Sequence, residues 1–175
     1  QEIPHSYIEK EFEVDPMESF VNKYIASKSF MTNLALIIKA TGEALNKNEN
    51  FNSYREESKI NYFSKVNIGI VIDLDGRLAV PIVKNIPEKN IDDIVKELLE
   101  MRKKLILNNL SLENLIDGTF TISSLDHTSA TRFYPIIHPK QGAVLGFPNS
   151  TKKLYIDENK KVIQKRVVNL GLSFD

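Results

Sequence analysis

The sequence has 175 residues, 42% of them hydrophobic, which is enough for a single domain with a substantial core. Its 23 lysine and arginine residues equal its 23 aspartate and glutamate residues, and this zero formal net charge argues against binding to nucleic acid or to an anionic membrane surface. The lack of cysteine excludes disulfides, thiolate metal sites and a cysteine nucleophile, and no apolar run approaches the roughly 20 residues of a membrane span.

The first predicted element is a half-exposed strand over residues 6–14, because its side chains alternate in character. One side carries Tyr7 and glutamates, and the other side is mostly apolar and consists of Ile8, Lys10, Phe12 and Val14. A helix is predicted to begin directly afterwards, since Asp15 can cap it, Pro16 fits the first helical position and Glu18 can complete a capping box.

Two further helices are predicted. Thr32 can cap the second, whose apolar stripe is Leu34, Ile37, Ile38 and Leu45, and the asparagine-rich residues 46–52 end it. Asn90 precedes the third, in which Ile91, Ile94, Val95, Leu98, Leu99 and Leu105 oppose lysine and glutamate. We therefore expect a third helix that packs on one face only.

The remaining periodic segments are rich in valine and isoleucine. Residues 66–72 and 77–83 flank an Asp-Gly turn at Asp75 and Gly76, which predicts a hairpin. Further strands are predicted at residues 119–125 and 143–147, and a second hairpin joins 154–156 to 162–163. Helices and strands do not alternate strictly, so we expect an α+β fold in which a mixed or largely antiparallel sheet packs helices against one face.

Generic catalytic and phosphate-binding motifs are absent from the sequence. The histidines His5, His127 and His138 are too widely spaced to predict a metal site. The segment from Asp73 to Gly76 faintly resembles a calcium loop but lacks its terminal glutamate, so a turn explains it better. We expect no metal.

Several segments, taken in order, resemble one family. They are Ile3-Pro4-His5, residues 30–45, 66–73, 78–84, 118–125, 135–137 and 142–146, and Leu172-Ser173-Phe174-Asp175. Together they are similar to the catalytic core of the dihydrolipoamide acyltransferases of 2-oxo acid dehydrogenase complexes, in the chloramphenicol acetyltransferase-like superfamily. The resemblance covers essentially residues 1–175 and implies a two-layer sandwich.

The resemblance implies transfer of an acyl group between a dihydrolipoyl arm, carried on a separate domain, and coenzyme A. Ser123, in Phe-Thr-Ile-Ser-x-Leu, matches the family's donor to the oxyanion of the tetrahedral intermediate. One such donor is worth about 3 to 4 kcal/mol. The alternative is that Thr119, Thr121 and Ser123 form only the polar side of a strand whose other side is apolar.

Asp175 matches the aspartate that precedes the family's catalytic histidine in His-Arg-x-x-x-Asp-Gly. The resemblance implies that it orients the turn presenting this base, and the alternative is a solvated strand end. We expect His5 to make a local hydrogen bond at the start of a strand. We expect His127 to be a surface loop residue, because four residues of extended chain carry it away from Ser123.

The chain also departs from the family. After the serine the family usually reads Leu-Gly-x-x-Gly-Gly-Thr, whereas Asp126, Ser129 and Ala130 replace the three glycines here. Loss of glycine can reshape the entrance for the lipoyl arm or coenzyme A. The family core also begins earlier, with a helix, and ends later, with the histidine motif and a last helix, so we expect residues 1–175 to be a fragment of that core.

By resemblance, the partners are further copies of the chain, forming homotrimers that build a larger hollow core, together with lipoyl domains and the decarboxylase and dihydrolipoamide dehydrogenase components. One alternative is a structural core component that transfers nothing, and another is a free-standing antibiotic acetyltransferase. Residues 1–5 lack the layout of a secretion signal. We expect a cytoplasmic protein, or a mitochondrial matrix protein in a eukaryote.

Overall fold

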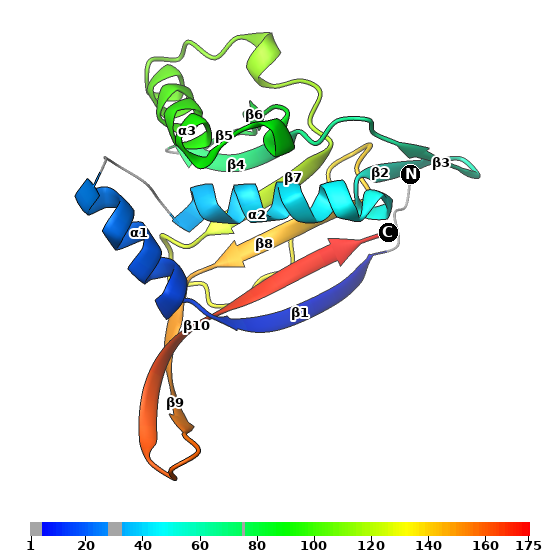
Figure 1. Ribbon diagram of the computed structural model, residues 1–175. Coiled ribbons are helices and arrows are strands. Elements are labelled where there is room, and N and C mark those ends of the chain that lie inside the picture. Colours follow the sequence, from blue (N-terminus) through cyan, green and yellow to red (C-terminus); the bar gives the residue numbers. More distant parts are fainter. Residues whose placement is uncertain (1–4, 28–32, 75) are drawn as a thin grey trace.

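The computed structural model describes residues 5–27, 33–74 and 76–175 (Figure 1). The α-helices are α1 Asp15–Ser27, α2 Asn33–Lys47 and α3 Ile91–Ile106, and the short 3-10 helices are η1 Glu49–Phe51, η2 Ile86–Glu88 and η3 Leu112–Asn114. The strands are β1 Ser6–Glu13, β2 Ser53–Glu56, β3 Lys59–Tyr62, β4 Ile68–Leu74, β5 Arg77–Ala79, β6 Ile82–Val83, β7 Phe120–Leu125, β8 Ala143–Pro148, β9 Thr151–Ile156 and β10 Val162–Phe174.

The main sheet is mixed. Its strand order is β1-β10-β8-β7-β4-β5, with β6 also paired to β4 and β9 to β10. The central strands β4, β7 and β8 run parallel, and β10 runs antiparallel to β8, β9 and β1. The prediction of an α+β fold with a mixed sheet is confirmed. Both predicted hairpins are present, as β4–β5 and β9–β10.

The three helices lie together on one face of this sheet (Figure 1). Their buried side chains, among them Ile38 of α2 and Ile94 of α3, form one core with Ile70 and Ile122 of the sheet. Burying each such side chain contributes about 1.5–3 kcal/mol. The predicted stripe of α2 is thus confirmed, and so is that of α3 except for Leu99, which is 41% exposed. Asn90 caps α3 by accepting a 3.0 Å hydrogen bond from the Asp93 amide.

The opposite face of the sheet is crossed by an irregular stretch of chain, residues 131–139, here called the crossing segment. It is tied to the sheet by several long-range hydrogen bonds: Asn169 Nδ2 donates to the Thr131 carbonyl (3.4 Å), Tyr134 donates to Glu9 (3.2 Å), and the Ile137 amide donates to His5 Nε2 (3.1 Å). Among the described residues, this face is thus covered by irregular chain and not by a helix.

The prediction of a half-exposed first strand needs correction, because β1 is exposed on both sides. Ile8 and Phe12, on its apolar side, are 58% and 42% exposed, and only Val14, just beyond β1, is buried. The helices cover the central strands and do not extend over the edge strand β1 (Figure 1). The glutamates on the other side are engaged instead: Glu9 with Arg132, Glu11 with Lys153 and Tyr155, and Glu13 with Lys165.

The start of α1 uses its acidic residues for tertiary contacts. Asp15 accepts a 2.9 Å hydrogen bond from the Arg166 amide, and Glu18 pairs with the Arg166 guanidinium at 3.1 Å. The proposed cap Thr32, the residues Ile3 and Pro4, and Asp75 lie outside the described residues. The first hairpin turn is nevertheless visible at Gly76, whose φ of 80° is the positive value the Asp-Gly pattern predicts.

Candidate active site

Ser123 lies on β7, on the face of the sheet opposite the helices. Phe120 and Ile122 of the same strand are buried in the core beneath the helices, so the alternating Thr121 and Ser123 point to the other face. The sequence-based expectation of a strand with one polar and one apolar side is confirmed. Ser123 is partly exposed, and among the described residues none forms a hydrogen bond with its hydroxyl.

Small residues surround Ser123 on its face. In register with it are Val71 of β4, Gly146 of β8 and, one strand further, Gly171 of β10. A β-carbon on Gly146 would lie 3.1 Å from Pro135 Cδ, and one on Gly171 would lie 3.2 Å from the Phe133 carbonyl oxygen. The glycines therefore let the crossing segment lie close to the sheet beside the serine.

A pocket of about 280 Å³ lies next to this position and includes Thr121, two residues before Ser123. The Thr121 hydroxyl donates a 2.7 Å hydrogen bond to Gln141 Oε1, and Gln141 Nε2 donates to the Gly118 carbonyl at 3.1 Å. Both side chains are buried, and these hydrogen bonds fix their orientation, so they form a rigid polar wall of the pocket. The apolar side of the pocket includes Val80 and Ile82.

Asp175 lies at a second pocket, of about 480 Å³. Its carboxylate is 3.3 Å from the Arg55 guanidinium, and its side chain is 18% exposed. Its amide donates a 3.0 Å hydrogen bond to the Gly142 carbonyl, which continues the pairing of β10 with β8. The Asp175 carboxylate thus has a partner, although the residue as a whole is exposed.

The structure does not bring Ser123 and Asp175 together within one chain. Ser123 is in register with Gly146 of β8 and Gly171 of β10. Asp175 lies four residues beyond Gly171 in the chain, next to the first residue of β8. With about 3.3 Å per residue and about 4.8 Å between strands, the Cα atoms of Ser123 and Asp175 are about 16 Å apart. Within one chain the two side chains are therefore too far apart to bond to each other or to one reacting atom.

The histidines form no common site. His5 accepts a hydrogen bond from Ile137, a residue 132 positions away, so the expectation of a local bond was wrong although the role is structural. The His127 side chain is 71% exposed and lies 3.7 Å from Asp126, as expected for a surface loop. His138 is exposed. In the part of the chain that the structure describes, no group of three or more His, Cys, Asp or Glu side chains could hold a metal ion.

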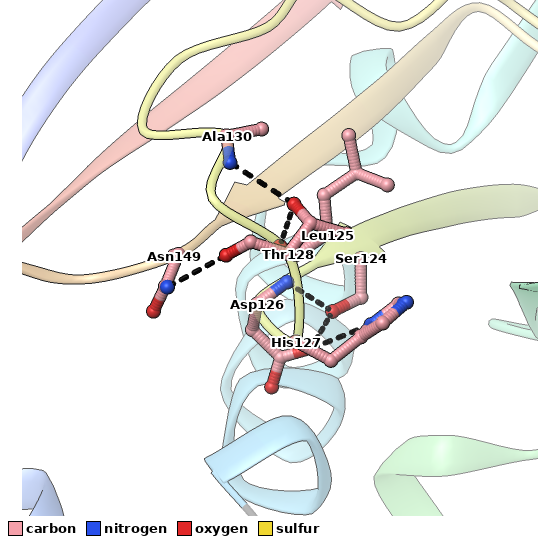
Figure 2. A network of polar contacts seen from close by, with 7 residues as sticks. All are labelled: Ser124, Leu125, Asp126, His127, Thr128, Ala130 and Asn149. Carbon is pink, nitrogen blue, oxygen red and sulfur yellow. Dashed lines mark hydrogen bonds and ion pairs between the residues drawn. The ribbon is translucent and has the colours of Figure 1, made fainter.

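The loop that has lost its glycines is held by its own polar network (Figure 2). Ser124 donates a 2.6 Å hydrogen bond to Asp126, Thr128 Oγ1 donates to the Leu125 carbonyl at 2.8 Å, and Asn149 Nδ2 donates to the Thr128 carbonyl at 2.7 Å. None of the three replacing residues has a positive φ. Ordinary residues therefore fit this loop conformation without backbone strain.

Sequence analysis missed Arg55 and the hairpin that carries it, β2–β3. A signal was available, because Tyr54, Ile60 and Tyr62 alternate with polar residues on both sides of the short link Glu57-Ser58. Nothing in the sequence, however, pairs Arg55 with Asp175, which is 120 positions further along the chain. No helix within the described ranges is long and apolar enough to cross a membrane.

Comparison with known proteins gives one consistent family. Residues 1–175 match the family model described as "2-oxoacid dehydrogenases acyltransferase (catalytic domain)". The chain is 34% identical to the dihydrolipoyllysine-residue acetyltransferase component of the pyruvate dehydrogenase complex of Buchnera aphidicola, over 99% of this chain and 45% of that protein. The chain thus spans less than half the length of this relative.

Solved structures agree. A probable dihydrolipoamide acetyltransferase from Listeria monocytogenes superposes with a TM-score of 0.92 at 29% identity, covering 99% of this chain and 76% of that one. The cubic core of a pyruvate dehydrogenase multienzyme complex gives 0.91 at 26% identity, covering 99% and 73%. Chloramphenicol acetyltransferase gives 0.62 at 13% identity, covering 98% and 78%, and shares the fold.

Proposed function

This chain belongs to the family of 2-oxo acid dehydrogenase acyltransferase catalytic domains, and we propose on that basis that, in its parent protein, it transfers an acyl group between a dihydrolipoyl arm and coenzyme A. The single observation that carries the proposal is the family match over residues 1–175, which includes the block around Ser123. The acyl group enters and leaves as a thioester, so the reaction is a thioester exchange that needs no metal.

We propose the following roles. A base, which the resemblance places directly after Asp175, removes the proton of the coenzyme A thiol. The thiolate sulfur bonds to the thioester carbon, the carbon–sulfur bond to the lipoyl arm breaks, and the proton returns to the departing thiolate. Ser123 donates a hydrogen bond to the oxyanion of the tetrahedral intermediate, which exists after the new carbon–sulfur bond forms and before the old one breaks. The Ser123 hydroxyl suits this role because none of the described residues forms a hydrogen bond with it.

The separation of Ser123 and Asp175 supports a site shared between copies of the chain. About 16 Å of sheet divides them within one protomer, so the serine of one copy would face the base of its neighbour. A closed ring of identical copies repeats such a shared site at each interface. We therefore propose assembly into trimers that build a hollow core, since the cubic core of a pyruvate dehydrogenase complex has this same fold.

The further partners in this proposal are lipoyl domains and the decarboxylase and dihydrolipoamide dehydrogenase components. Coenzyme A and the lipoyl arm act as substrates that bind the assembled site. The proposed compartment is the cytoplasm, or the mitochondrial matrix of a eukaryote. These proposals extend the family relationship to a whole parent protein. Relatives such as the Buchnera protein are more than twice as long as this chain.

The test is an assay of the full-length parent protein with acetyl-coenzyme A and dihydrolipoamide, in which formation of acetyl-dihydrolipoamide supports the proposal. A correctly assembled protein that transfers no acetyl, succinyl or branched-chain acyl group would contradict it and favour the structural core component. Acetylation of chloramphenicol without use of dihydrolipoamide would instead identify an antibiotic acetyltransferase, whose fold the chain shares.

A further inference from the structure

The hairpin β2–β3 and the residues just before it pack against the end of β10. The contacts come from three residues, of which Phe51 ends η1 and Ser53 and Arg55 lie on β2. Phe51 packs edge-on against Phe174 with ring centroids 6.0 Å apart, and Arg55 pairs with Asp175 at 3.3 Å. Between them, the Ser53 backbone lies against Gly142. Residues 51–55 thus contact the last residues of β10 and Gly142, which directly precedes β8.

Gly142 makes the close approach possible. A β-carbon at this position would lie 2.6 Å from the Ser53 carbonyl oxygen, a distance that real β-carbons essentially never show. The carbonyl of Gly142 also accepts the hydrogen bond from the Asp175 amide at 3.0 Å. The residue that pairs with Asp175 through the backbone is therefore the residue against which the hairpin packs.

The hairpin is itself anchored to the body of the protein. Asn52 is buried, and its Nδ2 donates to the carbonyls of Phe63 (3.3 Å) and Lys65 (2.9 Å), which lead into β4. Tyr54 stacks near Phe63 with centroids 5.2 Å apart. Arg55 thus extends from a fixed support, since the hairpin's position is set on one side by the lead to β4 and on the other by Gly142.

We propose that Arg55 is a positioning residue for the acyl transfer reaction: it holds the Asp175 carboxylate and so fixes the direction in which the chain leaves β10. This inference rests on the proposed function, in which the base stands directly after Asp175. Arg55 acts through Asp175 and is not assigned a contact with substrate. An orientation error of about 1 Å at a reacting group can cost on the order of 100-fold in rate, so a half-exposed ion pair can matter for turnover while adding little to folding.

The experiment uses the full-length parent protein with Arg55→Gln, Arg55→Lys, Asp175→Asn and the double variant Arg55→Gln/Asp175→Asn. Lys59→Gln is the matched control, because Lys59 is an exposed cation on β3 of the same hairpin. We expect Arg55→Gln to lower kcat about 10-fold with the KM for coenzyme A unchanged, and Arg55→Lys to recover part of the loss. The double variant should be no slower than the slower single variant, because both changes break one interaction.

A second readout does not depend on activity. Hydrogen–deuterium exchange of peptides covering residues 170–175 should be faster in Arg55→Gln than in the Lys59→Gln control. Equal kcat in Arg55→Gln and Lys59→Gln, or losses that multiply in the double variant, would overturn the positioning role, and so would faster exchange without loss of turnover. A parent protein that transfers no acyl group refutes the proposed function and the positioning role together, while unchanged exchange in Arg55→Gln refutes the hold of the hairpin on the end of β10 independently.

Discussion

Ser123 and Gly146 lie opposite each other on the parallel strands β7 and β8, and the space that a side chain on Gly146 would fill is taken by Phe133 and Pro135 of the crossing segment. The serine is therefore bounded by Val71 on one side and by the crossing segment on the other. Its neighbour Ser124 points to the helix face, where it bonds to Asp126. Two adjacent serines thus have opposite surroundings.

This arrangement gives a matched pair of variants for testing the proposed oxyanion donor. Ser123→Ala in the full-length protein should lower kcat by about 100- to 1,000-fold, because one hydrogen bond to the oxyanion is lost. Ser124→Ala should retain the parent turnover, since Ser124 lies on the other face of the sheet. Steady-state transfer from acetyl-coenzyme A to dihydrolipoamide measures both. Equal turnover in the two variants would remove Ser123 from the mechanism.

The loop of residues 125–131 predicts a small and purely conformational effect of restoring a glycine. Ala130 has no positive φ, and its amide and carbonyl bond to Thr128 and Asn149. Ala130→Gly keeps these backbone bonds but gives the unfolded chain more freedom, so the free energy of unfolding should fall by about 0.4–1 kcal/mol. Urea unfolding checks this value. An increase in stability would show that the loop is strained by its non-glycine residues.

The contact between α2 and η2 predicts that glycine is the better residue at position 42 and alanine the better residue at position 44. A β-carbon on Gly42 would lie 2.1 Å from Ile86 Cγ2, so Gly42→Ala should destabilise by about 1–3 kcal/mol despite the better helix propensity of alanine. The exposed Ala44 has no such neighbour, so Ala44→Gly should cost about 1 kcal/mol from propensity alone. Stabilisation by Gly42→Ala in urea unfolding would mean that Ile86 moves aside freely.

Glu11 on β1 predicts a contribution to stability that depends on pH. The hydrogen bond from Lys153 holds the pKa of the Glu11 carboxyl below its ordinary value of 4.5, and the bond from Tyr155 adds to this effect. Because the pKa is lowered in the folded state, the contribution is present above pH 4.5 and is lost as the pH falls through the folded-state pKa.

An NMR titration of the Glu11 carboxyl measures this shift directly. Lys153→Gln should bring the pKa back toward 4.5, since it removes the largest cause of the shift. Lys152→Gln is the control, because Lys152 is an adjacent exposed cation on the same strand. Salt should also weaken the shift, as the pair is exposed to solvent. A pKa that does not change in Lys153→Gln would show that the ion pair is not formed in solution.

The sequence predicts the central part of this fold well because local and tertiary preferences agree there. Strand β7 has an apolar side opposite a polar side, β8 is a short apolar run, and α3 has both an apolar stripe and a cap at Asn90. The face on which Ser123 lies also follows from simple alternation along β7. Each of these features can be predicted from residues that are close together in the sequence.

Other parts depend on residues far apart in the sequence. Hairpin β2–β3 turns at Glu57, which has a φ of 55°, a conformation for which Asn or Gly is the usual signal. The exposure of Ile8 and Phe12 depends on where the helix layer ends. The pairing of Arg55 with Asp175, and the separation of Ser123 from Asp175, depend on strand order and register. No local pattern carries this information.

The pairing of β1 with β10 also has a consequence for biosynthesis. Ser6 is opposite Phe174, so the strand that leaves the ribosome first among those described must wait for nearly the whole of this sequence before its partner exists. Until then its backbone donors and acceptors are open to other chains, and such long-range closure is intrinsically slow. The carboxylates of Glu9, Glu11 and Glu13 give nascent copies a shared negative charge along that strand, which opposes their pairing with one another.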